Sequence, residues 1–394
     1  MKIFIKGLCL IFLFQVLPAS IYGQEKKEKN WTLRGYVKDL VTFNFLQENN
    51  LFNESLFVDN LIHNRLNFKW YVTEDFSLNL EVRNRLFHGD LVKAIPNYSR
   101  FIDVNDDYLD LSVNVIDRKD VVLHSMIDRA FVQWNKNDWE IRFGRQRINW
   151  GTNLVWNPND LFNAYSFFDF DYEERPGSDA LRIQRYIGVA SSFEVAVKMA
   201  DDTEDLVAAG MWKINKGGYD VQFLGGYANE DIALGLGWAG NIKTSGFKGE
   251  MTYFHPTESS DSKTYLLALT WDYSFKNSLY VLWSGIYNSS GSNEPSQFET
   301  VSFTSNQRLT AKDLSPYRYS SIVQGSYPIH PLVNAGLAIM VFPGDRSMFI
   351  YPTVSWSIIQ NLDIDLFGQF FWDDPNGTFE STSKLIFVRG KWSF

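Results

Sequence analysis

Apolar and polar side chains alternate with a period of two along most of this chain. In the segment EDFSLNLEVRNRLF, which spans 74–87, the even positions from 76 to 82 are apolar and the odd positions are polar or charged. The segments at 262–275 and 361–372 repeat the pattern. Because successive side chains of a β-strand point to opposite faces, each segment is predicted to be a strand with one apolar face.

The chain must also place 32 phenylalanines and 13 tryptophans, and aromatic residues make up 16% of it. Beyond its first residues, no segment approaches the run of about 18 apolar residues that marks a membrane-spanning helix. Only helices and closed barrels satisfy every backbone hydrogen bond inside a bilayer. The alternating, aromatic-rich segments therefore predict an all-β fold, a transmembrane antiparallel β-barrel.

About eighteen such strands can be counted, an even number, as in bacterial single-chain barrels. Short links, such as 73–74, 216–217 and 360, follow even-numbered strands. Long connections follow several odd-numbered strands, at 44–57, 89–123, 149–177 and 290–316. Short turns at one rim and long loops at the other are typical of outer-membrane barrels, so the long-loop rim is expected to be extracellular.

The two ends of the sequence carry signals of export. Lys2 and Lys6 precede an apolar core, and small residues follow, which predicts a signal peptide at 1–23. A membrane-anchoring helix is the alternative, but the apolar core is shorter than the ~20 residues that span a bilayer. Residues 24–30 are read as a short periplasmic tail and 31–394 as the barrel. The final strand ends on the aromatic Phe394, which resembles the signal for assembly in the outer membrane of Gram-negative bacteria.

The formal net charge is −9, yet the stretch RFGRQRINWGTNLVWNPNDLFN, at 142–163, gathers three arginines and then leaves the strand pattern. It opens the third long loop, at 149–177. In general porins the third extracellular loop folds back into the barrel, and a similar fold-back is expected here. Asn157 as a helix cap and Pro158 after it predict a short helix, followed by Asp160.

Charges of opposite sign are predicted to face each other across the lumen. The constriction loop supplies Asn157, Asp160, Asp169, Asp171, Glu173 and Glu174. By alternation, the inward faces of the wall strands supply Arg65, Lys69, Arg83, Arg85, Arg129, Arg142 and Arg182, beside His63. Opposed charge at a constriction orients and filters polar solutes. The alternative is a salt-bridged network that fills a closed lumen.

Three arginines do not fit the alternation. Arg145 and Arg147 share the parity of apolar neighbours, and so does Arg185, so a regular strand would turn each of them toward lipid. A bulge at Gly144 or a position at the membrane rim would remove the conflict for the first two. The sequence offers no explanation for Arg185.

The segment GRQRINWG, at 144–151, resembles a strand-then-Trp-Gly signature of outer-membrane porin-like barrels, a group that includes alginate-export-type proteins. The match covers about twenty residues. The resemblance implies an 18-stranded barrel with an arginine-rich lumen that passes anionic or polar organic solutes. Arg145, Gln146 and Trp150 are the residues that it carries over.

Other chemistries find little support in the sequence. The five histidines lack metal-ligand spacing, and no nucleophile elbow or zinc-protease motif is present, so no enzyme, metal or cofactor is predicted. The acidic run at 169–174 lacks the spacing of a helix-loop-helix calcium site and is read as a solvated loop. The acidic sequence pI of about 5.2 disfavours nucleic-acid binding.

The sequence thus predicts an outer-membrane porin for passive diffusion of small polar solutes, with a preference for anions, through a lumen narrowed by the 149–177 loop. Its partners would be the lipid bilayer and the solutes, and a homo-oligomer or an outer-membrane complex is also considered. Two other hypotheses remain open: an occluded structural or assembly-partner barrel, and an outer-membrane hydrolase. Glycine-rich strands at 223–250 mark a place where the wall bends or meets a partner closely.

Overall fold

The computed structural model describes residues 29–46, 56–103, 107–165, 177–258, 262–293, 309–344, 346–374 and 378–394. The predicted signal peptide and residues 24–28 of the predicted tail lie outside these ranges. The unit from Trp31 to Phe394 is the barrel. Neither helix in the described part of the chain is long and apolar enough to cross a membrane.

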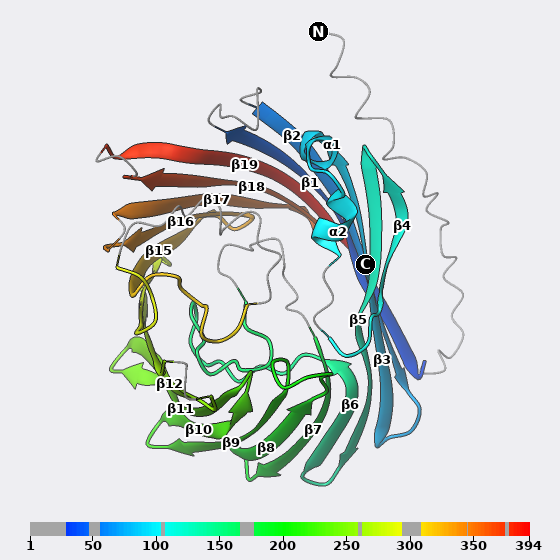
Figure 1. The fold of residues 1–394 in the computed structure, drawn as a ribbon, viewed down its shortest axis with the longest axis vertical. Helices are drawn as coiled ribbons and strands as arrows, with labels where there is room; N and C mark the ends of the chain where they lie inside the picture. The colour runs from blue at the N-terminus through cyan, green and yellow to red at the C-terminus, as the bar shows by residue number, and fades with distance from the viewer. Residues whose placement is uncertain are drawn as a thin grey trace. The chain divides into compact units, whose positions relative to one another are not determined.

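Nineteen strands and two short helices occur in the described ranges (Figure 1). The first half holds β1 (Trp31–Leu46), β2 (Leu56–Tyr71), β3 (Phe76–Gly89), α1 (Asp90–Ala94), α2 (Tyr98–Ile102), β4 (Ser112–Arg118), β5 (Val121–Lys136), β6 (Trp139–Gln146), β7 (Ser178–Ile187), β8 (Ser191–Lys198) and β9 (Val207–Lys216). The second half holds β10 (Tyr219–Ala228), β11 (Asp231–Ile242), β12 (Ser245–Pro256), β13 (Thr264–Ser274), β14 (Tyr280–Asn288), β15 (Tyr319–His330), β16 (Val333–Phe342), β17 (Ser347–Ile359), β18 (Leu362–Asp373) and β19 (Glu380–Ser393).

Eighteen of these strands form a closed antiparallel ring, which confirms the predicted fold class. Each strand pairs with its neighbours in sequence, except that β3 pairs directly with β5. The ring closes where β1 pairs with β19, from Tyr36 opposite Ser393 to Leu46 opposite Ser383. No edge of the ring is left open, so every wall strand has hydrogen-bonded neighbours on both sides.

The additional strand, β4, corrects the prediction of an unstructured connection at 89–123. On one side β5 pairs with β3 along nearly its whole length. On its other side, residues 130–136 pair with β6 and residues 121–126 pair with β4. Since β6 ends early, at Gln146, β4 occupies the place beside β5 that a longer β6 would fill. The helices α1 and α2 lie in the same connection and bury Val92 and Ile102 against β5.

The two rims differ as predicted. All the links between β2 and β3, β5 and β6, β7 and β8 and later equivalent pairs are short and lie at the rim where Trp31 and Phe394 are found. The longer connections, including those after β3, β6 and β14, lie at the opposite rim. The fold therefore has a short-turn rim and a long-loop rim, which are the periplasmic and extracellular sides of such barrels.

Aromatic side chains ring the outward face near both rims. Tryptophans lie toward the short-turn rim and are 40–49% exposed, among them Trp70, Trp139, Trp271, Trp356 and Trp392. Toward the long-loop rim, tyrosine rings of adjacent strands meet, with Tyr253 stacked on Tyr265 at 4.8 Å and Tyr287 5.4 Å from Tyr319. Leucine, isoleucine and valine dominate between the two belts. An apolar band between aromatic belts is the outer surface that a bilayer requires.

A charge placed on this band should be costly in proportion to its depth. Leu366→Arg, in the middle of β18, is expected to lower the free energy of unfolding by about 2–4 kcal/mol. Ile359→Arg, at the end of β17 beside a short turn, should cost at most about 1 kcal/mol. Denaturant unfolding in phospholipid vesicles measures both, and equal costs would contradict the position of the band.

Candidate pore lumen

Strand β6 ends at Gln146, just after a glycine with positive φ, and the chain then turns into the barrel. Gly144 has a φ of +114°, and a Cβ there would lie 2.3 Å from the carbonyl oxygen of Ala130. Only glycine accepts this conformation without strain. After Gly144, Arg145 and Gln146 are both buried, at 3% and 0% exposure. The pairing of β6 with β5 and β7 continues through Gly144 without a register shift, so the predicted bulge is not found, and the positive φ of Gly144 precedes the buried Arg145 instead.

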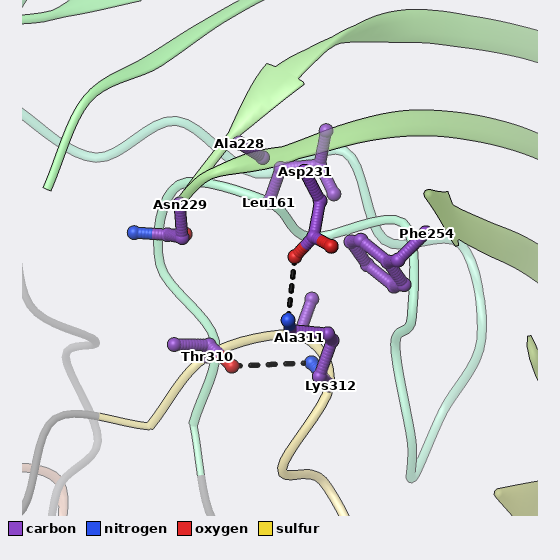
Figure 2. Close-up of a pocket in the computed structure, with 8 residues that line it drawn as sticks. All are labelled: Leu161, Ala228, Asn229, Asp231, Phe254, Thr310, Ala311 and Lys312. Atoms are coloured by element: carbon purple, nitrogen blue, oxygen red, sulfur yellow. Dashed lines mark hydrogen bonds and ion pairs between the residues drawn. The ribbon is translucent and has the colours of Figure 1, made fainter. Parts of the chain in front are cut away.

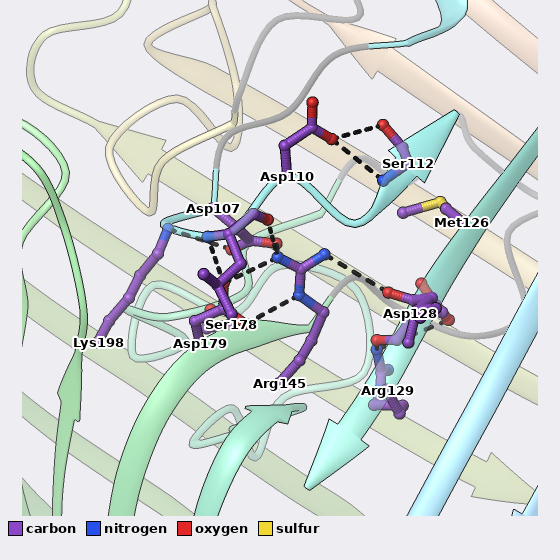
Figure 3. Close-up of polar contacts among 12 residues, drawn as sticks. Asp107, Asp110, Ser112, Met126, Asp128, Arg129, Arg145, Ser178, Asp179 and Lys198 are labelled. Atoms are coloured by element: carbon purple, nitrogen blue, oxygen red, sulfur yellow. Dashed lines mark hydrogen bonds and ion pairs between the residues drawn. The ribbon is translucent and has the colours of Figure 1, made fainter. Parts of the chain in front are cut away.

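Arg145 ties three parts of the barrel together (Figure 3). Its Nε and Nη2 donate to the two carboxylate oxygens of Asp179 on β7, at 2.9 and 2.8 Å. Nη2 also donates to the backbone oxygen of Leu109 and lies 3.6 Å from Asp107, both in the connection before β4. Bidentate pairing of this kind fixes orientation as well as distance. Arg145 therefore joins the ends of β6 and β7, where the chain leaves the wall, to the segment that leads into β4.

The other two misfit arginines also have an explanation. Arg147 follows the last residue of β6, so strand parity no longer applies to it, and it is half-buried. Arg185 is exposed near the short-turn end of β7, with its guanidinium carbon 5.3 Å from the ring centroid of Trp139. At that rim a cation lies among headgroups and stacks on the aromatic belt, where its cost is small.

Residues 147–165, which we call the inner loop, run inside the barrel. Trp150 is 1% exposed, and its Nε1 donates to Glu194 of β8 at 2.6 Å. Its backbone oxygen accepts from Nε2 of Gln222 on β10 at 2.7 Å, and its ring meets Phe162 edge-on at 5.0 Å. The inner loop is thus fixed to the inward faces of β8 and β10. Gln146 and Trp150, two residues of the GRQ…WG motif, sit where the chain enters the lumen.

One carboxylate, Glu250 on β12, binds residues 152–160, which we call the tip of the inner loop. It is fully buried and accepts the backbone N–H groups of Thr152 and Asn153 on one oxygen and of Asn159 on the other, the last two at 2.7 and 2.9 Å. The neighbouring Thr252 donates to Oδ1 of Asn159 at 2.8 Å. Irregular backbone inside a membrane needs such partners because no strand pairs with it. For this loop, Glu250 supplies the hydrogen-bond acceptors that a neighbouring strand supplies elsewhere in the wall.

The predicted helix at Asn157 and Pro158 is wrong. The chain makes a single turn there, in which the Asp160 N–H donates to the Asn157 oxygen at 3.0 Å. Glu250 takes the Asn159 N–H, and the Asp160 side chain lies 3.4 Å from the Trp150 backbone nitrogen. Contacts with the wall therefore outweigh the local preference for a helix. Asn157 and Asp160 are both buried, at 2% and 1% exposure.

The glycine-rich strands make room for the tip. Gly235 and Gly237 face inward on β11, and a Cβ at either would lie 2.5 or 2.9 Å from side-chain atoms of Asn159. On the loop itself, a Cβ at Gly151 would lie 2.4 Å from Oδ1 of Asn157. The sequence predicted that the wall bends or meets a partner closely at 223–250. The structure shows a close partner there, the inner loop of the same chain.

A second segment, residues 309–318, folds inward beside the tip. Lys312 pairs with the buried Asp231 at 2.5 Å, and Asn288 donates to the backbone oxygens of Lys312 and Ser315. A pocket of about 10 Å³ lies between this segment and the inner loop (Figure 2). Its lining residues are Leu161, Ala228, Asn229, Asp231, Phe254, Thr310, Ala311 and Lys312. A cavity of that size holds about one water molecule, so the junction is packed rather than open.

Two of the predicted pore arginines pair with carboxylates of wall strands. Arg65 is fully buried and pairs with Glu81 and Asp128. Arg182 donates to both oxygens of Glu194 at 2.7 and 2.8 Å and lies 3.7 Å from Glu140. These acidic partners face inward like the arginines, but no local motif in the sequence marks them.

The remaining predicted cations also face inward. Their contacts include the ring of Tyr71 for Lys69 at 4.9 Å, Met126 for Arg83, His124 for Arg85 at 3.1 Å, the backbone oxygen of Asp128 for Arg129 at 2.8 Å and Glu140 for Arg142 at 3.0 Å. The predicted loop carboxylates Asp169, Asp171, Glu173 and Glu174 lie outside the described residues. In the described structure, the carboxylates that pair with these arginines lie on wall strands and not on the loop.

Five basic side chains form one row across five neighbouring strands. The Cα pairing runs from Lys391 on β19 to Lys38 on β1, His63 on β2, Arg85 on β3 and His124 on β5. Directly opposed residues share a face of the sheet, and burial puts this face inward, with Lys38, His63 and His124 at most 2% exposed. We call this set the basic row. At the β19 end of the row, Lys391 pairs with Asp363 of β18.

The two histidines of the basic row differ in their contacts. Arg85 can only donate, so Nδ1 of His124 must accept from it, and Nε2 then donates to Asp103 at 3.0 Å. Neither ring nitrogen of His63 has a hydrogen-bond partner among the described residues, although its ring meets Tyr36 edge-on at 5.4 Å. A buried polar group without a partner is unusual in a folded protein. His63 is therefore a place where an added ligand or water could bind.

Solved structures with the same fold are outer-membrane porin-type barrels. OccAB2 of Acinetobacter baumannii aligns over 93% of this chain and 98% of its own, with a TM-score of 0.61 at 7% identity. OccK11 (OpdR) of Pseudomonas aeruginosa aligns over 92% and 96%, with a TM-score of 0.57 at 7% identity. OccK5 (OpdH) of the same organism aligns over 92% and 98%, with a TM-score of 0.56 at 8% identity.

No protein-family model and no curated protein sequence matches the chain. At such low identity the structural similarity shows the fold alone. Together with the aromatic belts and the apolar outer band, the fold places this protein in the outer membrane.

Glu250→Gln should loosen the tip of the inner loop, because an amide NH₂ cannot accept the N–H groups that the lost carboxylate oxygen held. Losing a buried charge-assisted hydrogen bond costs about 1.5–3 kcal/mol, so amide exchange at Thr152, Asn153 and Asn159 should accelerate at least about tenfold. Hydrogen-exchange mass spectrometry measures it.

Thr270→Val is the matched control. Thr270 is also fully buried on the inward face, on β13, but it bonds to Ser284 and not to the inner loop. Its substitution should leave exchange in the inner loop unchanged. Equal exchange in the Glu250→Gln variant and the unsubstituted protein would contradict the role of Glu250.

Proposed function

We propose that this protein is a passive outer-membrane porin for small polar solutes, with a preference for anions such as organic carboxylates. Solutes would diffuse through an aqueous lumen that the inner loop narrows. The fold shared with outer-membrane channels supports the general function. The resemblance of GRQRINWG to porin-like barrels points in the same direction.

The basic row carries the proposed preference for anions. Its three permanent cations lie close together: Lys391 and Lys38 oppose each other directly, and Arg85 lies two strands further along the row, beyond His63. Like charges in that arrangement repel, and the repulsion falls when an anion lies among them. Inside a lumen of lower dielectric than water, this attraction is stronger than it would be on an open surface.

The position of the inner loop supports the proposal that this loop narrows the lumen. It packs against β8, β10 and β12, on the side of the ring away from the basic row. On that side small inward residues, among them Ala196, Ala209 and Ala233, leave room for the loop, and the buried polar residues Glu194, Gln222 and Glu250 bind it. A solute path would therefore run between the inner loop and the basic wall formed by β19, β1, β2, β3 and β5.

The competing hypothesis is a barrel with an occluded lumen that serves a structural role. The tight fit of the inner loop against one side of the wall is the observation in its favour. A conductance measurement separates the two, because only an open lumen passes ions in discrete steps.

The test is single-channel conductance of the refolded protein in a planar bilayer, with the reversal potential under a salt gradient. The unsubstituted protein should open in discrete steps and prefer anions. Replacing Arg85 and Lys391 together by glutamine should move the reversal potential toward zero, because two cations leave the basic row. Both are inward-facing, so the barrel's outer surface is unchanged.

The matched control replaces Arg185 and Lys216 by glutamine. Both are exposed cations at the short-turn ends of β7 and β9, outside the lumen. This variant should keep the ion preference of the unsubstituted protein. The absence of conductance from folded protein would favour the occluded barrel, and an unchanged reversal potential in the Arg85 and Lys391 variant would contradict anion selection by the basic row.

A further inference from the structure

The outward face of the barrel carries one polar patch in the middle of its wall. Asp39, Asn60, Asn64, Asn84 and Ser125 project outward from β1, β2, β3 and β5, which are neighbours in the ring. We call these five side chains the outer polar patch. On the rest of the described wall, outward charges such as Arg185 and Lys384 lie near strand ends.

The side chains of the outer polar patch bind one another across the strands. Asn64, Asn84 and Ser125 are directly opposed by strand register. Asn84 donates to Asn64 at 3.2 Å, and Ser125 donates to Asn84 at 2.8 Å. Asn64 donates to the backbone oxygen of Tyr36 at 3.1 Å, and Asn60 donates to Asp39. The patch therefore consists of two neighbouring hydrogen-bonded groups, Asp39 with Asn60 and Asn64 with Asn84 and Ser125, which together span four strands.

This patch lies within the lipid-facing band, not above it. On β2, Asn64 is far from both ends of the strand, which runs from Leu56 to Tyr71. Outward residues on either side of it are apolar and exposed, with Val58 at 38% toward the long-loop rim and Trp70 at 40% toward the short-turn rim. The polar groups thus interrupt the part of the wall that should contact acyl chains.

Acyl chains are a poor environment for these groups. Each asparagine amide carries two N–H donors, and the described contacts use one of them in each of Asn60, Asn64 and Asn84. Asp39 adds a carboxylate, and ionisable residues at this depth usually face protein or water. Polar side chains in a membrane are stabilised when they hydrogen-bond across a protein interface.

We propose that the outer polar patch is the interface through which a second copy of this chain docks in the membrane. Copies inserted in the same direction are related by an axis along the membrane normal. Around such an axis, the β1 side of one patch faces the β5 side of the next. Asp39, which only accepts, then lies toward Ser125 and Asn84 of the other copy, which carry donors. Amides and hydroxyls donate and accept, so the patch complements itself.

The test is cysteine crosslinking of the full chain in isolated outer membranes. Leu86→Cys places a thiol on β3 beside the outer polar patch, and Leu269→Cys places one at mid-strand on β13, across the ring. Both are made with Cys9→Ser, since Cys9 is the only cysteine in the sequence. A bifunctional maleimide with a short spacer should join two copies through Leu86→Cys and should not do so through Leu269→Cys.

A second variant separates docking from folding. Asn64→Leu with Asn84→Leu, added to Leu86→Cys, should abolish the crosslink while the barrel keeps its heat-modifiable migration on gels, because leucine suits lipid but makes no hydrogen bond. Three results would overturn the proposal: no crosslink through Leu86→Cys in folded protein, equal crosslinking through Leu269→Cys, or a Leu86→Cys product that contains only a different protein.

Discussion

The closure of the ring between β1 and β19 is the constraint on which the rest of the structure depends. A bilayer offers no hydrogen bonds to an open sheet edge, so the first and last wall strands must pair, and they do so over eleven consecutive residue pairs. A closed antiparallel wall then sends alternate side chains to lipid and to the lumen. The apolar outer band and the charged interior both follow from this single geometry.

Inside the ring, the irregular backbone of the inner loop needs partners that no neighbouring strand supplies. Glu250 and Gln222 provide them from two wall strands, and Glu194 holds the Trp150 side chain of the same loop. The inner loop packs against the β8–β12 side of the lumen. The basic row lies on β19, β1, β2, β3 and β5, apart from the loop, and sets the electrostatics that the proposed function uses.

The features that follow from strand alternation could be predicted from the sequence. The features that depend on contacts between residues far apart in the chain could not. Strand parity placed Arg65 and Arg182 on the inward face, but the bulge that it suggested at Gly144 is not found, since β6 pairs in unbroken register there. It missed β4, because a seven-residue strand that pairs on one side only leaves little pattern in a long connection. Glu250 lies 91–98 residues from the backbone groups it binds, and no local signal marks it. Those same contacts replaced the helix expected at Asn157.

The most direct test of this account is the single-channel conductance of a variant whose residues 152–160 are replaced by a glycine-serine linker of equal length. The tip of the inner loop would lose its contacts with Glu250, while the basic row would remain intact. The account predicts a larger conductance with the preference for anions retained. An unchanged conductance from folded protein would contradict the claim that the inner loop narrows the lumen.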